Sequence, residues 1–258
     1  MTRTILRGRV LSFLREPQAI DDVESFFYIE DGAITIEDGR IVAVGAFVAD
    51  DTAVVIDHRP HLILPGFIDT HLHYVQSQIV ASYAGSLLEW LNTYTFIEEQ
   101  KFSQQGHAGA VAAAFYDELV RNGTTTAVAY CSSHPQSVHA FFGEAEKRNM
   151  LMIGGKVMMD RNAPEALRDT PQSGYDDTRA LIGEWHGKGR LHYAVTPRFA
   201  ITSTPEQMEM AGALAGEFPE LHVQTHLSEN RAEIELTREL YPWCADYTDV
   251  YARYGLLG

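Results

Sequence analysis

The chain has 258 residues, of which 45% are hydrophobic, and its formal net charge at pH 7 is -15. This length and composition suit one large or two smaller globular domains and argue against a disordered chain. The 20 Lys and Arg residues form no basic run, so a nucleic acid is excluded as the expected partner because its phosphates would be repelled.

The sequence also bears on the cellular compartment. Residues 1–10 contain no apolar core of signal-peptide length, and no later window approaches the length needed to span a bilayer. Cys131 and Cys244 are too few for a disulfide framework or a cysteine-based zinc site, although one disulfide between them stays open. We therefore expect a soluble, cytoplasmic protein without a membrane partner.

Residues 1–62 have the pattern of a small β-domain. Two Asp-Gly pairs, Asp31-Gly32 and Asp38-Gly39, each lie between runs of strand-forming residues. Asp-Gly readily adopts the positive φ angles of short hairpin turns, so a hairpin is expected at each pair.

Residues 63–258 show strand patterns that alternate with helical patterns, which is typical of βα units around a parallel sheet. The five expected strands, the first of which begins at the domain boundary, are residues 62–73, 124–130, 151–159, 191–200 and 221–229. Five units are too few to close an eight-stranded barrel. The expected fold is thus an α/β barrel that is truncated before its last strands.

Helices are expected between these strands. Val111, Phe115 and Leu119 recur every four residues and should form the buried stripe of one helix. Residues 134–149 and residues 204–217 have helical patterns as well. The second of these helices should have Thr204 as its N-cap. A last helix is expected near the end of the chain, before Gly255.

Two histidines stand one residue apart in PGFIDTHLH, at the end of the first parallel strand. Residues two apart on a strand point to the same face, so His71 and His73 can both reach one ion. Imidazole is a good zinc ligand, and barrels of this class place their chemistry at the carboxyl ends of the strands. The alternative is a pair of hydrogen-bonded histidines without a metal, since His-x-His alone is a weak motif.

A second motif, THLSEN, ends the fifth expected strand. His226 can supply a third nitrogen ligand, and Glu229 can carry a proton in the same cavity. Three nitrogen ligands leave one coordination position for water, which is an arrangement suited to hydrolysis. The alternative is a core histidine and a solvated carboxylate at a helix start.

Five blocks of the chain resemble the guanine deaminases of the amidohydrolase superfamily: HLHYVQSQ, LLEWLNTYTFIEEQKF, GKVMMDRN, TPRFAITST and THLSEN. The resemblance implies a metal-dependent (β/α)8 TIM-like barrel, here about five units over residues 63–258, beside a small β-sandwich domain to which residues 1–62 contribute the N-terminal strands. It implies one Zn2+ per chain held by His71, His73 and His226, with Glu229 as the catalytic residue.

The same resemblance implies hydrolysis of guanine to xanthine and ammonia by a homodimer. The residues that it places against guanine are His73, Gln76, Arg198, Phe199, His226 and Glu229. An arginine fork matches the O6 and N7 acceptors of guanine, and a glutamine can donate and accept along the ring edge. Taken alone, Arg198 would be interpreted as a salt-bridge residue and Phe199 as a core residue.

Other interpretations stay open. The nearest alternative is an amidohydrolase that acts on another nitrogen heterocycle, and a second is a non-catalytic metal-binding scaffold. The H-x-E and P-C-x-x-C signature of the cytidine and adenosine editing deaminases is absent. Trp90 is expected in the core or the pocket wall, and Lys156 is assigned no metal role.

The family pattern continues with another strand-end histidine and with an aspartate that completes the zinc site, and the 258 residues contain neither. Asp246 and Asp249 stand in a helical context and cannot replace that aspartate. We therefore expect the 258-residue chain by itself to be inactive and, with the fifth strand left open at its edge, an unstable monomer.

Overall fold

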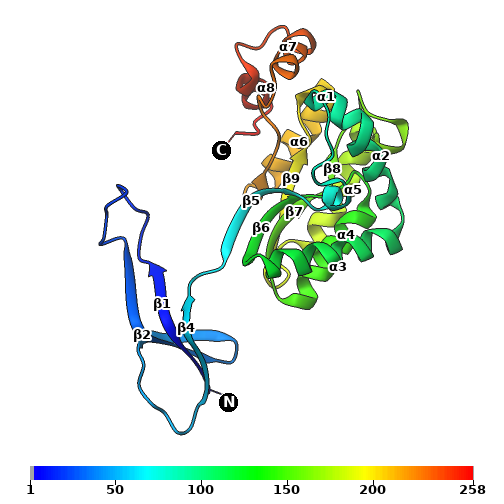
Figure 1. Ribbon diagram of the computed structural model, residues 1–258. Coiled ribbons are helices and arrows are strands. Elements are labelled where there is room, and N and C mark those ends of the chain that lie inside the picture. The colour runs from blue at the N-terminus through cyan, green and yellow to red at the C-terminus, as the bar shows by residue number, and fades with distance from the viewer. Residues whose placement is uncertain (1–2, 258) are drawn as a thin grey trace. The chain divides into compact units, whose positions relative to one another are not determined.

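A computed structural model describes residues 3–257, and the chain divides into two units, Met1–Gly66 and Phe67–Gly258. Each unit contains its own sheet, as Figure 1 shows. Among the residues described, no helix has the length and apolar character needed to cross a membrane. Cys131 and Cys244 are both free thiols, so they form no disulfide with each other.

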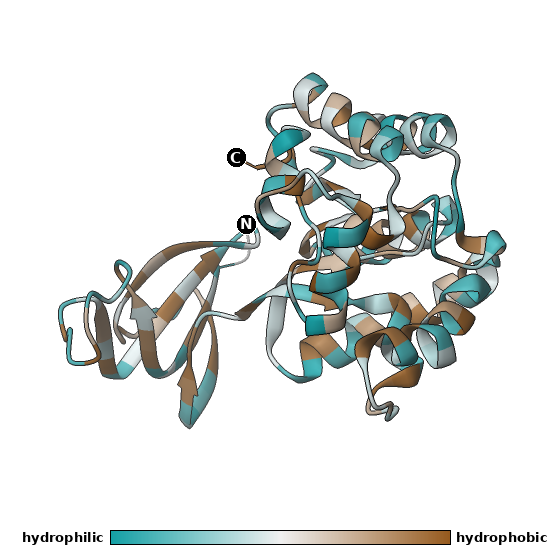
Figure 2. Cartoon of the chain, turned by 90° about the horizontal axis from the view of Figure 1, so that it is seen from above, coloured by the Kyte–Doolittle hydropathy of each residue, from teal (hydrophilic) through white to brown (hydrophobic). Residues whose placement is uncertain are grey.

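The first unit is a four-stranded sheet in the order β3-β2-β1-β4. Its strands are β1 (Arg3–Phe13), β2 (Phe26–Glu37), β3 (Arg40–Ala46) and β4 (Val54–Ile63). β1 pairs antiparallel with β2 and parallel with β4, while β2 and β3 are antiparallel. Hydrophobic residues run along these strands in Figure 2, and several of them, including Ile41 and Val44, are exposed.

The two Asp-Gly pairs of this unit differ in conformation. Asp38 and Gly39 have φ angles of 49° and 75° and form the predicted tight turn between β2 and β3. The hairpin predicted at Asp31-Gly32 is wrong, because both residues lie inside β2. A Cβ on Gly32 would lie 2.7 Å from the Cγ2 atom of Val10, so this glycine allows β1 and β2 to approach closely beside a register shift.

The second unit contains a curled parallel sheet in the order β10-β9-β7-β6-β5, with β8 paired to β9, and helices cover its outer face (Figure 1). Its strands are β5 (Phe67–His73), β6 (Thr124–Tyr130), β7 (Leu151–Gly155), β8 (Val157–Met158), β9 (Leu191–Pro197) and β10 (His222–Val223). All of their pairings are parallel. This half-barrel confirms the predicted α/β fold class.

Four of the five strands differ from their expected bounds, and the fourth simply ends at Pro197, three residues before Ala200. The first is divided, because β4 ends and β5 begins on either side of the Pro65-Gly66 dipeptide, which is unsuited to a strand interior. The third is interrupted at Lys156. The fifth is wrong beyond Val223, although the next residues still follow β9: the backbone nitrogens of Gln224 and His226 donate to carbonyls of Val195 and Arg198.

Eight α-helices lie within the described residues 67–257: α1 (Leu87–Trp90), α2 (Phe96–Glu99), α3 (Gln105–Arg121), α4 (Pro135–Arg148), α5 (Pro171–Trp185), α6 (Pro205–Glu217), α7 (Arg231–Leu240) and α8 (Tyr247–Arg253). Short 3-10 helices span Tyr74–Ile79, Gln100–Ser103, Glu165–Leu167 and Ala200–Thr202. A π-helical turn, Leu91–Thr95, connects α1 to α2.

The helix patterns predicted from sequence are present. Val111, Phe115 and Leu119 form a buried stripe on α3 that packs in the main core. The hydroxyl of Thr204 accepts a hydrogen bond from the backbone nitrogen of Gln207 and caps α6. These helices pack against the outer face of the sheet. The carboxyl ends of its strands therefore remain available for polar side chains.

Candidate active site

Three histidines converge at the carboxyl ends of the first and last strands of the half-barrel. His71 and His73 end β5, and His226 lies three residues after β10. The ring centroids of His71 and His73 are 5.4 Å apart, and each lies 4.9 Å from the centroid of His226. One nitrogen from each ring lies within 4.8 Å of the other two, so a single metal ion can contact all three.

The hydrogen bonds of His226 show which of its nitrogens is available. Its Nδ1 atom lies 2.7 Å from the carbonyl oxygen of Arg198, which can only accept, so Nδ1 carries the proton. The Nε2 lone pair then points toward His73, whose own Nε2 lies 2.9 Å away. The lone pair of a neutral imidazole is what a metal ion requires, so the arrangement fits a nitrogen-ligated ion such as zinc.

Burial keeps the rings of His73 and His226 neutral. Desolvation, with a smaller contribution from the positive charge of Arg198, lowers the pKa of His226 to about 3. Desolvation also holds the pKa of His73 well below its ordinary value. The ring of Tyr130 stacks on His73 at 4.5 Å and lies 4.4 Å from His226, so it fixes both imidazoles from one side.

A cavity of about 170 Å³ opens beside the histidines. Its walls contain all seven residues predicted from sequence: His71, His73, Gln76, Arg198, Phe199, His226 and Glu229. Leu87, Leu91 and Trp90 complete its lining, so Trp90 is a pocket-wall residue. A wider and more apolar hollow of about 890 Å³ shares only His71, His73, Gln76 and Trp90 with it. The smaller cavity is the candidate site because the three histidines line it together with the polar side chains of Gln76, Arg198 and Glu229.

Glu229 lies at the edge of the histidine cluster. Its Oε1 atom is 3.9 Å from Nε2 of His226, and its side chain is 43% exposed. Partial burial, together with the negative charge of Glu233, raises the pKa of the Glu229 carboxyl. Glu233 also accepts hydrogen bonds from the backbone nitrogens of Glu229 and Asn230, which holds this loop against the start of α7.

A buried carboxylate, Glu99, organises the opposite wall. Nη1 of Arg198 donates to its two oxygens at 3.0 and 2.7 Å, and Nε2 of Gln76 donates to Oε1 at 3.1 Å. The salt bridge considered as the alternative for Arg198 is therefore present, and the same residue also lines the cavity. Glu99 was not predicted from the sequence, where its signal was a pair of adjacent glutamates in the FIEEQKF segment.

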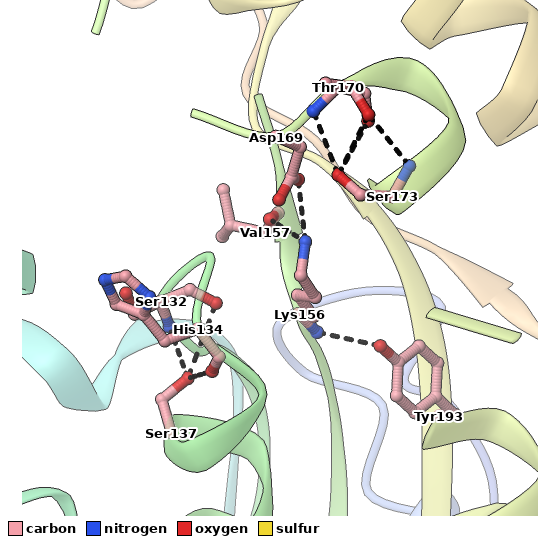
Figure 3. Close-up of polar contacts among 9 residues, drawn as sticks. All are labelled: Ser132, His134, Ser137, Lys156, Val157, Asp169, Thr170, Ser173 and Tyr193. Atoms are coloured by element: carbon pink, nitrogen blue, oxygen red, sulfur yellow. Dashed lines mark hydrogen bonds and ion pairs between the residues drawn. The ribbon is translucent and has the colours of Figure 1, made fainter. Parts of the chain in front are cut away.

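Lys156 lies outside this constellation. Its Nζ atom is buried and 2.6 Å from Oδ2 of Asp169, while its backbone nitrogen donates to the hydroxyl of Tyr193 at 2.9 Å (Figure 3). Lys156 does not line the cavity. Asp246 and Asp249 serve the helix start of α8: Oδ1 of Asp246 accepts from the backbone nitrogen of Asp249.

Comparisons with known proteins identify the family of this chain. Residues 62–258 match the model of the Amidohydrolase family. Guanine deaminase of Escherichia coli is 48% identical over 256 residues, which are 96% of this chain and 58% of that protein. Its solved structure gives a TM-score of 0.96 at 46% identity and covers 99% of this chain and 60% of that one.

A structure of guanine deaminase from C. acetobutylicum with bound guanine in the active site gives a TM-score of 0.90 at 31% identity, and covers 100% of this chain and 60% of that one. The chain thus spans less than two thirds of the length of these relatives.

Proposed function

Because this chain belongs to the amidohydrolase family, we propose that it takes part in the zinc-dependent hydrolysis of guanine to xanthine and ammonia. The observation that carries the proposal is the cavity of about 170 Å³ in which three imidazoles, a carboxylate and a pair of amide and guanidinium groups face one another. The similarity to guanine deaminases over nearly the whole chain supports guanine as the substrate.

In this proposal His71, His73 and His226 hold one zinc ion. Their nitrogens lie within 4.8 Å of one another, and all three ligands are imidazoles, which suits zinc better than a hard cation such as magnesium. Zinc in such a site supplies Lewis acidity that makes water a nucleophile near neutral pH. Tyr130 and the carbonyl of Arg198 keep the rings in the orientation that the ion requires.

Glu229 is proposed to move the proton. Its carboxylate lies at the rim of the histidine cluster, where it can accept a proton from the attacking water. It then returns the proton to a ring nitrogen of the base. The oxygen adds to C2 of guanine, the bond between C2 and the exocyclic nitrogen breaks, and ammonia leaves with the second proton.

The opposite wall is proposed to bind the base. Arg198 can donate from the nitrogens that Glu99 does not occupy, and Gln76 adds a second polar contact. Phe199 and Trp90 supply apolar surface against which a planar ring can lie. A site of this composition favours a flat, polar-edged heterocycle over a flexible substrate.

The proposal is tested by the release of ammonia from a panel of bases with the purified full-length protein. Guanine should be deaminated, whereas adenine, cytosine and an amino-substituted triazine should react at least about a hundredfold more slowly, as expected for a site built to pair with substrate polar groups. If one of the other bases reacted faster than guanine, that base would be the substrate and guanine would not. The cytoplasmic location and the homodimer implied by the resemblance are likewise proposals, to be checked by fractionation and by light scattering.

A further inference from the structure

We propose that Glu99 is a positioning residue that sets the hydrogen-bond polarity of the cavity. It holds Arg198 in place and turns the amide of Gln76 so that the amide oxygen, and not the nitrogen, faces the bound base. The inference rests on the proposed function, because it states how a base is selected in the same cavity.

The geometry of the contact is specific. Glu99 is the last residue of α2 and is fully buried, as is the guanidinium with which it pairs. Both of its oxygens accept from Nη1 of Arg198, and Oε1 also accepts from Nε2 of Gln76. Phe96, on the same helix, lies with its ring centre 5.4 Å from Cζ of Arg198. One short helix therefore fixes both base-binding side chains.

The orientation of the Gln76 amide follows from chemistry. A carboxylate paired with a guanidinium has no proton to donate, so only the NH2 group of Gln76 can face it. The two ends of an amide are otherwise interchangeable in shape, and the hydrogen-bond partner decides between them. With Nε2 held by Glu99, Oε1 is the end of Gln76 that remains for the cavity.

This arrangement presents a donor and an acceptor in a fixed order. Arg198 offers only N-H groups, and Gln76 offers an oxygen. The lactam edge of an oxo-purine is complementary, since O6 accepts and the neighbouring N1-H donates. 2,6-Diaminopurine has the same 2-amino group as guanine but the opposite edge, with a 6-amino donor and an N1 acceptor. The cavity should therefore reject 2,6-diaminopurine, and Glu99 should be the reason.

The test is the Glu99→Gln variant, whose neutral amide can donate as well as accept and so lets the Gln76 amide turn over. The dissociation constants of guanine and of 2,6-diaminopurine are measured by equilibrium dialysis in the presence of a chelator, so that guanine is not hydrolysed during the measurement. The wild-type protein should bind guanine at least about a hundredfold more tightly, and the ratio should fall about tenfold or more in the variant. Glu98→Gln is the matched control, because Glu98 is also buried on α2 but bonds to Lys101, and it should leave the ratio unchanged.

Two further variants make the result decisive. In a Gln76→Met background the Glu99→Gln change should have no further effect on the ratio, because the side chain that it reorients is gone. Glu99→Asp keeps the charge for the case in which the neutral variant fails to fold; its shorter arm withdraws from Gln76, so the ratio should fall here too.

Equal weakening of both bases in either Glu99 variant would assign Glu99 a purely structural role and overturn the inference. An unchanged ratio in both would do the same. Binding also separates this inference from the proposed function: a protein that binds guanine selectively but releases no ammonia would refute the reaction, while the ratio still decides the role of Glu99.

Discussion

The Nδ1 atom of His226 lies 2.7 Å from the carbonyl oxygen of Arg198, and the backbone nitrogen of His226 donates to the same oxygen at 3.1 Å. The residue proposed to bind the base thus also orients a proposed zinc ligand through its main chain. The proposed zinc site and the proposed base-binding wall meet at the carbonyl group of Arg198, so a shift in the position of one should shift the other.

We expect the protein to hold about one zinc ion per chain, because three imidazole nitrogens converge on one point. Replacing His71 and His73 together by Ala removes two of the three ligands and should abolish zinc retention in elemental analysis. His222→Ala is the control, since His222 is exposed on β10 and outside the cluster. Full zinc content in the double variant would refute the metal site.

In the full-length protein, Glu229→Gln should lower the rate of guanine hydrolysis by roughly two or more orders of magnitude while zinc content stays the same. The amide keeps the shape of the carboxylate but cannot take and return a proton. Steady-state kinetics and metal analysis of the same preparation measure both effects. Glu235→Gln, on the exposed face of α7, should change neither. A rate near that of the wild type in Glu229→Gln would show that Glu229 is not the proton carrier.

Arg198→Lys should raise KM for guanine more than it lowers kcat. In Arg198 the single nitrogen Nη1 contacts both oxygens of Glu99 and leaves the other nitrogens for the base, whereas a lysine has only one nitrogen for both tasks. Initial rates over a range of guanine concentrations separate the two constants. Arg179→Lys, at an exposed position on α5, is the control for the loss of a guanidinium. An unchanged KM would remove Arg198 from the base-binding wall.

The metal-free protein should lose stability on acidification. The pKa of His226 is about 3 in the folded chain, below the ordinary value of 6.5, so between these values the unfolded chain binds a proton that the folded chain refuses. The free energy of unfolding should therefore fall as pH decreases, by about 2 kcal/mol between pH 6.5 and pH 5 for this one group.

Urea unfolding in the presence of a chelator at these two pH values measures the effect. His226→Gln removes the titrating group, so this variant should show the smaller dependence on pH. Equal dependence in the variant and the wild type would contradict the prediction.

Lys156→Met should destabilise the fold by about 3 kcal/mol, because it leaves the buried carboxylate of Asp169 without its partner. Zinc content should not change, since Lys156 is remote from the histidine cluster in its contacts. Lys188→Met, which breaks an exposed ion pair with Glu146, should cost less than about 1 kcal/mol. Thermal unfolding compares the stability of the two variants. Loss of zinc from Lys156→Met would contradict the prediction that this lysine has no metal role.

The sequence predicted those parts of the fold that depend on local pattern. The strand Thr124–Tyr130 has the bounds expected, because a turn glycine precedes it and its residues are mostly β-branched. Asp31-Gly32 was misjudged because an Asp-Gly pair has the same local preference in a hairpin and beside a bulge. What decides between them is the approach of Val10 from another strand, which is not visible locally.

In the site too, residues with a recognisable sequence motif were predicted, and residues whose role depends on distant contacts were not. The three histidines indicated a metal site through their strand-end positions, although His-x-His alone is a weak motif, and the family resemblance supplied the partners on the cavity wall. Tyr130 and Glu99 were not found, because a tyrosine at a strand end and a glutamate in a helix are ordinary residues in sequence. Their roles follow from the groups that the fold brings against them, the imidazole of His73 and the guanidinium of Arg198.

The π-helical turn Leu91–Thr95 imposes a constraint on chain length. It lies between two α-helical segments, and a π-turn contains one residue more than an α-turn. Because the extra residue is taken up within one turn, removing it would let the segment relax to an ordinary helix and would keep α1 and α2 in register. One further residue would instead rotate α2 by about 100° about its axis and turn Glu99 and Phe96 away from Arg198. Between Trp90 and Phe96 the chain should therefore tolerate the loss of one residue better than the gain of one, whereas surface loops tolerate both.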